Sequence, residues 1–113
     1  MAVMRLMGLR RLMSEYAPGS RDNWTWQEEH DDLFDREPLY MASLAAQIER
    51  HGMNTPIMLG DDGRIWDGHH RVCVAMELNR RLVPTVRWDD LTEDDYMGWL
   101  LAACGDAEAA GRF

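Results

Sequence analysis

Apolar residues recur at helical spacing in two stretches of the chain. The first stretch predicts a helix over residues 40–51, because its apolar side chains lie three or four positions apart and share one face. Pro38 suits the start of this helix and Gly52 suits its end, where a left-handed cap favours glycine. The second stretch, residues 71–79, predicts a helix that ends near Asn79, whose tolerance of positive φ fits a cap.

Short apolar runs between and after these helices predict strands. The runs cover residues 56–59, 64–66 and 83–88, and Asp61-Asp62-Gly63 forms a tight turn between the first two. Connections of a few residues join strands and helices in alternation. The pattern therefore predicts an α/β (α+β) fold in which a small mixed sheet packs against helices.

The two ends of the chain have weaker patterns. Residues 1–16 fit a short strand or an irregular helix equally, and residues 21–38 are polar and acidic without a clear period. Trp24 and Trp26 would face one side of a strand, where edge packing is favoured over base stacking because few cations lie nearby. Residues 94–104 predict a last helix with Thr92 as its N-cap, and residues 105–113 predict a flexible tail.

Composition narrows the classes of function. The chain has 113 residues, which predicts a single domain over residues 1–113. A net charge of −8 argues against the basic face that duplex binding requires, so sequence-specific DNA binding is not expected. Cys73 and Cys104 are too few for a disulfide framework or a thiolate metal site, and Cys73 is expected to be a small buried hydrophobe. Arginines interrupt the apolar start, so the expectation is a cytoplasmic protein without a membrane span, and Met4 or Met7 would also serve as its start.

The strongest candidate site is the polar turn between the second predicted strand and the helix that follows. A strand-to-helix turn presents free backbone N–H groups and a positive helix end, which suits an anion. Arg71 would add a planar fork of donors for a phosphate, and its place in a first helical turn is unfavourable unless an anion is present. Arg71→Ala is then expected to weaken nucleotide binding and leave the fold intact, unless Arg71 pairs with an acid of residues 28–35. The turn consists of Asp67, Gly68, His69, His70 and Arg71.

The two adjacent histidines have different expected roles. On a helix their side chains point about 100° apart, so they do not chelate one metal ion, and no metal site is predicted. One imidazole is expected to bond the backbone beneath the turn, while the other, with His69 favoured, faces the pocket to donate to a phosphate or move a proton. Asp67 is an N-cap or Asx-turn former, with a further role in orienting a nucleophile or metal. The candidate catalytic residues are Asp67, His69 and His70, and the candidate phosphate-binding residues are Gly68, His69, His70 and Arg71.

The order of these pieces resembles the ParB/sulfiredoxin domain. The resemblance covers Tyr40 to Trp88 and is closest to the small phage and bacterial proteins labelled "ParB-like nuclease". It implies that the turn binds nucleotide phosphates, as in CTP-binding partition proteins, ATP-using sulfiredoxins and ADP- or ATP-dependent serine kinases. His69 stands where sulfiredoxins have their catalytic cysteine, which excludes that chemistry. Neither the polar Glu-Asn helix of partition proteins nor a helix-turn-helix follows Trp88.

Three functions remain open on these grounds. The first is a phage or actinobacterial ParB-like protein that binds CTP, ATP or ADP, with Mg²⁺ as a candidate cofactor and phosphotransfer or nucleotide hydrolysis as a candidate activity. The second is a DNA-acting nuclease or a DNA-binding accessory. The third is a non-catalytic phage module that binds a protein partner or forms a homodimer. In the acidic segment a solvated face is the simpler interpretation, and a base or Mg²⁺ ligand is the alternative; its members are Glu28, Glu29, Asp31, Asp32 and Asp35.

Overall fold

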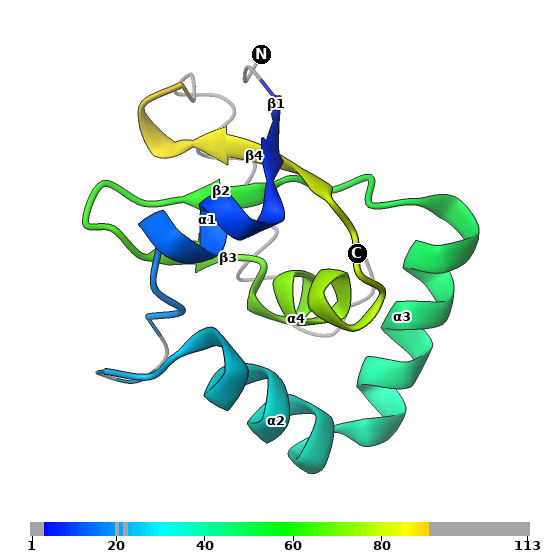
Figure 1. Ribbon diagram of the computed structural model, residues 1–113. Coiled ribbons are helices and arrows are strands. Elements are labelled where there is room, and N and C mark those ends of the chain that lie inside the picture. Colours follow the sequence, from blue (N-terminus) through cyan, green and yellow to red (C-terminus); the bar gives the residue numbers. More distant parts are fainter. Residues whose placement is uncertain (1–3, 20, 22, 91–113) are drawn as a thin grey trace, which may run out of the picture.

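A mixed four-stranded sheet joins segments from both halves of the chain (Figure 1). The computed structural model describes residues 4–19, 21 and 23–90. The strands are arranged in the order β1 (Arg5–Gly8), β4 (Leu82–Arg87), β2 (Ile57–Leu59) and β3 (Ile65–Asp67). Only the β2–β4 pair is parallel, and the β1–β4 and β2–β3 pairs are antiparallel. The predicted mixed sheet is therefore confirmed, and it gains an edge strand from the amino-terminal segment.

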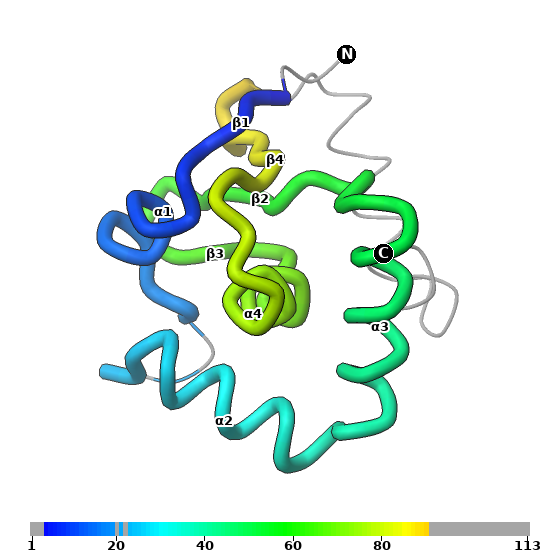
Figure 2. Tube along the Cα trace, turned by 45° about the vertical axis from the view of Figure 1, so that its right-hand side comes forward, coloured from blue at the N-terminus to red at the C-terminus, as the bar shows by residue number. Residues whose placement is uncertain are grey.

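The central helix, α4 (His69–Glu77), lies between the sheet and the other helices (Figure 2). It contacts α1 (Leu9–Glu15), α2 (Trp26–Arg36) and α3 (Pro38–His51), as well as β2. Five consecutive residues, Arg71 to Ala75, are buried. A helix enclosed on all sides needs no polar face, which explains why its apolar stripe is less regular than that of α3.

The predicted helices and strands of the second half are found within two residues of their expected limits. Helix α3 begins at Pro38, as the proline suggested, and ends at Gly52 with φ 78°. Asn79 follows α4 with φ 55°, so its expected left-handed conformation is confirmed. The strand after α4 is followed by a short 3₁₀ helix, Trp88–Asp90. The helix predicted over residues 94–104 and the tail over residues 105–113 lie outside the described residues.

The expectation of a strand around the two tryptophans is wrong. Trp26 begins α2, which starts with a capping box: the Thr25 hydroxyl accepts from the Glu28 N–H at 3.1 Å, and the Glu28 carboxylate accepts from the Thr25 N–H at 3.0 Å. Trp26 is buried and donates through Nε1 to the Tyr16 carbonyl at 2.7 Å. The Arg21 guanidinium instead lies over the Trp24 ring, with Arg21 Cζ 4.4 Å from the ring centroid. The reciprocal cap and the buried indole favour a helix that its acidic composition had obscured.

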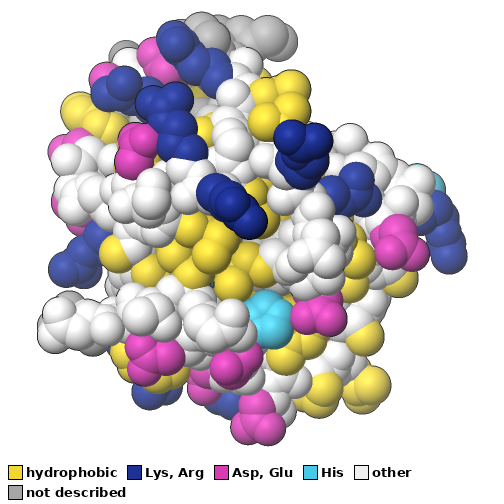
Figure 3. Space-filling model, viewed as in Figure 1, with side chains coloured by type: hydrophobic (Ala, Val, Ile, Leu, Met, Phe, Trp, Pro, Cys, Tyr) yellow, Lys and Arg dark blue, Asp and Glu magenta, His cyan; other side chains and the backbone are white. Residues whose placement is uncertain are grey.

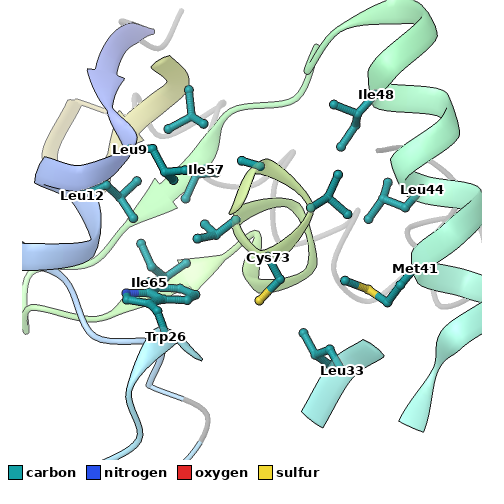
Figure 4. Packing of buried hydrophobic residues seen from close by; sticks show 14 of the residues in the cluster. Leu9, Leu12, Trp26, Leu33, Met41, Leu44, Ile48, Ile57, Ile65 and Cys73 are labelled. Carbon is teal, nitrogen blue, oxygen red and sulfur yellow. The ribbon is translucent and has the colours of Figure 1, made fainter. Parts of the chain in front are cut away.

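One hydrophobic core surrounds α4 and fixes its position (Figure 4). Cys73 points between α2 and α3, toward Leu33 and Met41, while Ile57 comes from the sheet. On the opposite side Leu12 of α1 is fully buried in the same cluster. Because α4 packs against α1, α2, α3 and β2, this packing determines where both of its ends lie. Among the described residues, no helix is long and apolar enough to cross a membrane.

Candidate functional site

Gly68 makes the sharp turn that places the start of α4. It has φ 112° and ψ 18°, a conformation that disfavours side chains. A Cβ atom there would lie 3.1 Å from Ile57 Cγ1 and 3.3 Å from Arg71 Nη2. The first helical hydrogen bond runs from the Val72 N–H to the Gly68 carbonyl at 2.9 Å. The N–H groups of the three preceding residues therefore have no acceptor within the helix, and glycine supplies no side-chain cap.

Arg71 lies beneath this turn and holds it to the chain before β2. Its side chain is only 1% exposed. Nη1 donates to the carbonyls of Thr55 and Pro56, the latter at 2.8 Å, and Nη2 donates to Asp67 Oδ2 at 3.2 Å. Burial lowers the pKa of the guanidinium, an effect opposed by the neighbouring Asp67 carboxylate. Arg71 therefore positions the turn.

This placement changes three sequence-based expectations. The fork of Arg71 was predicted to point toward a phosphate, but Nη1 donates to two backbone carbonyls and Nη2 donates to Asp67 instead. The competing prediction paired Arg71 with an acid of residues 28–35, whereas its ion-pair partner is Asp67. Asp67 was expected to cap the helix, and Gly68 occupies the N-cap position instead. The side chain of Asp67 remains 41% exposed, so solvent reaches it at the turn.

His69 is the histidine that bonds the backbone. Its Nε2 atom is hydrogen-bonded to the Pro18 carbonyl, and its ring centroid lies 6.4 Å from that of Trp26. A carbonyl oxygen only accepts, so Nε2 of His69 donates and carries the proton. One imidazole was expected to make such a bond, but the sequence had favoured His70 for that role. In the structure, His69 and not His70 makes this contact with the backbone.

His70 pairs with a carboxylate that lies 33 positions earlier in the chain. Its Nε2 atom is 3.1 Å from Glu37 Oε2, and the two side chains are 32% and 38% exposed. The edge of the Tyr40 ring meets the imidazole at a centroid distance of 5.2 Å and an interplanar angle of 82°. Burial, reinforced by Glu37, raises the pKa of the Tyr40 phenol, so this hydroxyl stays protonated. A carboxylate that orients an imidazole is an arrangement suited to moving a proton.

Glu37 and Tyr40 were missed by sequence analysis. Both lie where α2 ends and α3 begins, and this corner reaches His70 only because the two helices wrap around α4. No local pattern predicts such a contact. Two members of the expected acidic cluster have partners on α2 itself: Asp31 binds His30 at 3.0 Å and Asp32 binds Arg36 at 2.9 Å. Across residues 4–19, 21 and 23–90, no group of three or more His, Cys, Asp or Glu is placed to hold a metal ion.

Comparison with solved structures finds a known domain with a similar architecture. A Pnob8-like ParB-N domain superposes with a TM-score of 0.53 and 9% sequence identity, over 91% of this chain and 36% of that one. The chain has a ParB-N-like fold. No protein-family model and no curated protein sequence matches it. At this identity the structural similarity establishes the architecture alone. It covers 91% of the chain, whereas the sequence resemblance covered only residues 40–88.

Proposed function

We propose that the amino-terminal end of α4 binds the phosphates of a nucleotide, with CTP, ATP and ADP as the candidates. The main support for this proposal is the arrangement of backbone N–H groups at the start of α4. Three backbone N–H groups without helical acceptors follow a left-handed glycine, at the positive end of the helix dipole. The ParB-N-like fold adds support, because the sequence resemblance implies phosphate binding at this same turn.

The groups around the turn suit a phosphate in part and oppose it in part. The buried Arg71 charge and the three backbone N–H groups at the start of α4 would attract an anion. The carboxylates of Asp67 and Glu37 would repel it. Mg²⁺ bound between Asp67 and the phosphates would offset that repulsion, because carboxylate and phosphate oxygens are its usual ligands. Nucleotide binding at this site is therefore expected to be stronger with Mg²⁺ than without it.

The His70–Glu37 pair is the proposed proton-moving group. With Glu37 fixing its orientation, His70 would accept a proton from water or from a substrate hydroxyl during nucleotide hydrolysis or phosphotransfer. His69 suits this task less, because its Nε2 partner is the neutral Pro18 carbonyl, which stabilises an imidazolium less than a carboxylate does. Glu37→Gln should then lower turnover without lowering nucleotide affinity, because the change also removes a carboxylate that repels the phosphates.

The test is a melting and calorimetry series with CTP, ATP, ADP and GTP, each with and without Mg²⁺. A nucleotide at 100 times its dissociation constant stabilises the protein by about 2.7 kcal/mol. His70→Gln should weaken binding. The matched control is His51→Gln, an exposed histidine in the last turn of α3, which should leave binding unchanged. Failure of all four nucleotides to bind, or equal effects of the two histidine variants, would contradict the proposal.

A further inference from the structure

A hollow lies at the carboxyl-terminal end of α4, on the face shown in Figure 3. It encloses about 690 Å³ and lies where α1, α2 and the α4–β4 connection meet. In Figure 3 apolar side chains form its floor, and basic side chains gather above it. The apolar lining includes Leu9, Met13 and Met76, and the basic lining consists of Arg10, Arg80 and Arg81. No aspartate or glutamate of the described chain lines it, although the protein has 20 acidic residues against 12 basic ones.

Arginines near a helix end often compensate the partial negative charge of its last carbonyls. Here the backbone already satisfies those carbonyls. The Val74 carbonyl accepts from Leu78, that of Ala75 from Arg80, and that of Met76 from Asn79, at 2.9, 2.9 and 3.2 Å. The arginine side chains are therefore not needed to terminate α4.

The three arginines differ in what holds them. Arg80 Nη2 donates to the Ile48 carbonyl at the end of α3, at 3.2 Å, which fixes this side chain in the wall. Arg10 and Arg81 are exposed, and neither side chain makes a hydrogen bond or an ion pair within the described part of the chain. By contrast, Arg11, next to Arg10, is bound to Glu15 at 2.6 Å. Two unengaged guanidinium groups thus stand at the rim of an apolar hollow.

We propose that this hollow binds a small organic anion: a phosphate or carboxylate attached to an aromatic or aliphatic body. Its volume falls within the range of about 300–1,000 Å³ that is typical of small-molecule sites. Arginine forks bind phosphates and carboxylates with paired hydrogen bonds, and methionine side chains adapt to the shape of an apolar group. A long polyanion suits the site less, because the net charge of −8 repels it from the remaining surface.

This site is separate from the proposed phosphate site. The nine residues of α4 span roughly 13 Å, and the two sites lie at its opposite ends. They also differ in character, since the first site presents backbone N–H groups and imidazoles whereas the second presents arginine side chains above an apolar floor. Variants at one end should therefore leave binding at the other end unchanged.

The test uses 1-naphthyl phosphate and 1-naphthylacetate as probes, followed by their own fluorescence and by calorimetry. The two probes share the apolar body and distinguish a phosphate ligand from a carboxylate ligand. 1-Naphthol and inorganic phosphate serve as the body and the anion alone. At least one anionic probe should bind with a dissociation constant in the micromolar to millimolar range, and both partial ligands should bind at least about tenfold more weakly, because each lacks one half of the contacts.

Arg81→Gln should weaken probe binding about tenfold, since it removes one charge-assisted pair of hydrogen bonds. The matched control is Arg50→Gln, which removes an exposed arginine of α3 that does not line the hollow. His70→Gln, at the other end of α4, should also leave probe binding unchanged. Melting curves of all three variants establish that each is folded.

Four results would overturn the proposal. They are the absence of saturable probe binding, equal binding of 1-naphthol, equal effects of Arg81→Gln and Arg50→Gln, and loss of binding in His70→Gln alone. An acidic, leucine-containing peptide that binds through Arg81 when neither naphthyl probe does would also overturn it, and would assign this face to a protein partner.

Discussion

The two ends of α4 use arginine in opposite ways. At the amino-terminal end, Arg71 is 1% exposed and its Nη donors bind the carbonyls of Thr55 and Pro56 and the Asp67 carboxylate. At the carboxyl-terminal end, Arg10 and Arg81 are exposed above a hollow. The first turn of α4 contains no acidic residue and its last turn contains no basic residue, so the charges that flank the helix are those of Asp67 before it and of Arg80 and Arg81 after it.

The comparison shows that the position of a residue type along a helix does not determine its role. Arg71 was expected to bind a ligand because an arginine is unfavourable at a helix start without an anion. The protein supplies that anion itself, as Asp67, and uses the arginine to join two backbone segments. Arg10 and Arg81, which had attracted no functional interpretation, are the arginines that remain available to a ligand.

The largest expected effect comes from Arg71→Met, which keeps an apolar stem and removes the charge. The change leaves the Thr55 and Pro56 carbonyls without this donor and breaks a pair that is buried on the arginine side. A backbone carbonyl that loses its donor typically costs about 1–3 kcal/mol, whereas the Asp67 carboxylate that remains is 41% exposed and so adds little. Urea denaturation should show a loss of this size, and Arg50→Met, an exposed change on α3, should cost less than about 0.5 kcal/mol. Equal stability of the two variants would return Arg71 to the role of a ligand-binding residue.

The sequence predicted the part of the fold that local patterns encode. Helices α3 and α4 and strands β2, β3 and β4 follow from apolar spacing and from Pro38, Gly52 and Asn79. Helix α2 was missed although Thr25 and Glu28 have capping-box spacing, because the acidic residues after them obscured the apolar face. Strand β1 depends on pairing with β4, which lies far away in the sequence, and local periodicity does not encode such a pairing.

The strand-to-helix turn was predicted correctly, but the contacts that its residues make were not. Gly68 was expected at a strand-to-helix turn, and it occupies one with a positive φ. The contacts that distinguish His69 from His70 come from Pro18 and Glu37, which belong to distant segments. Such contacts follow from how α2 and α3 wrap around α4 rather than from any motif. The role of the turn as a phosphate site remains a prediction.

The middle of α4 offers a test of whether its two ends are separated by a dry core. Burial raises the pKa of the Cys73 thiol to about 12, from 9.0. The folded protein then keeps this proton over a range in which the unfolded chain releases it, so stability is lost as pH rises from about 9 to about 12. The total loss is at most about 4 kcal/mol, because each tenfold change in the proton affinity of the thiol is worth about 1.4 kcal/mol.

Urea denaturation at about pH 8 and about pH 10.5 measures this slope, and Cys73→Ala should flatten it. The chain contains no lysine, so few other groups titrate in this window. Tyr40, whose pKa is also raised, contributes in the same direction in both proteins and cancels in the comparison. Parallel slopes for the two proteins would mean that Cys73 reaches water and that α4 is less enclosed than the packing indicates.

A smaller effect is expected at the turn itself. Gly68→Ala places a Cβ 3.1 Å from Ile57 Cγ1 at a φ of 112°, which should cost about 1–3 kcal/mol. Gly8→Ala is the matched control, because Gly8 also precedes a helix but has φ −63° and no atom closer than 3.9 Å to the added carbon. Thermal melting of both variants should show a clear loss only for Gly68→Ala. A similar loss in both would attribute the effect to the helix start in general and remove the argument for a specially shaped turn.

The smallest effect is expected for Arg81→Gln, which removes an arginine charge at the other end of α4 from Arg71. Arg81→Gln removes an exposed guanidinium that binds no described group, while its backbone carbonyl still accepts from the Leu9 N–H at 2.9 Å. Surface changes of this kind usually alter the free energy of unfolding by less than about 0.5 kcal/mol. Urea denaturation of Arg81→Gln should therefore match the wild-type protein within that limit, at low and at moderate salt alike. A loss above about 1 kcal/mol would show that Arg81 stabilises the fold as Arg71 does, and both ends of α4 would then use arginine for structure.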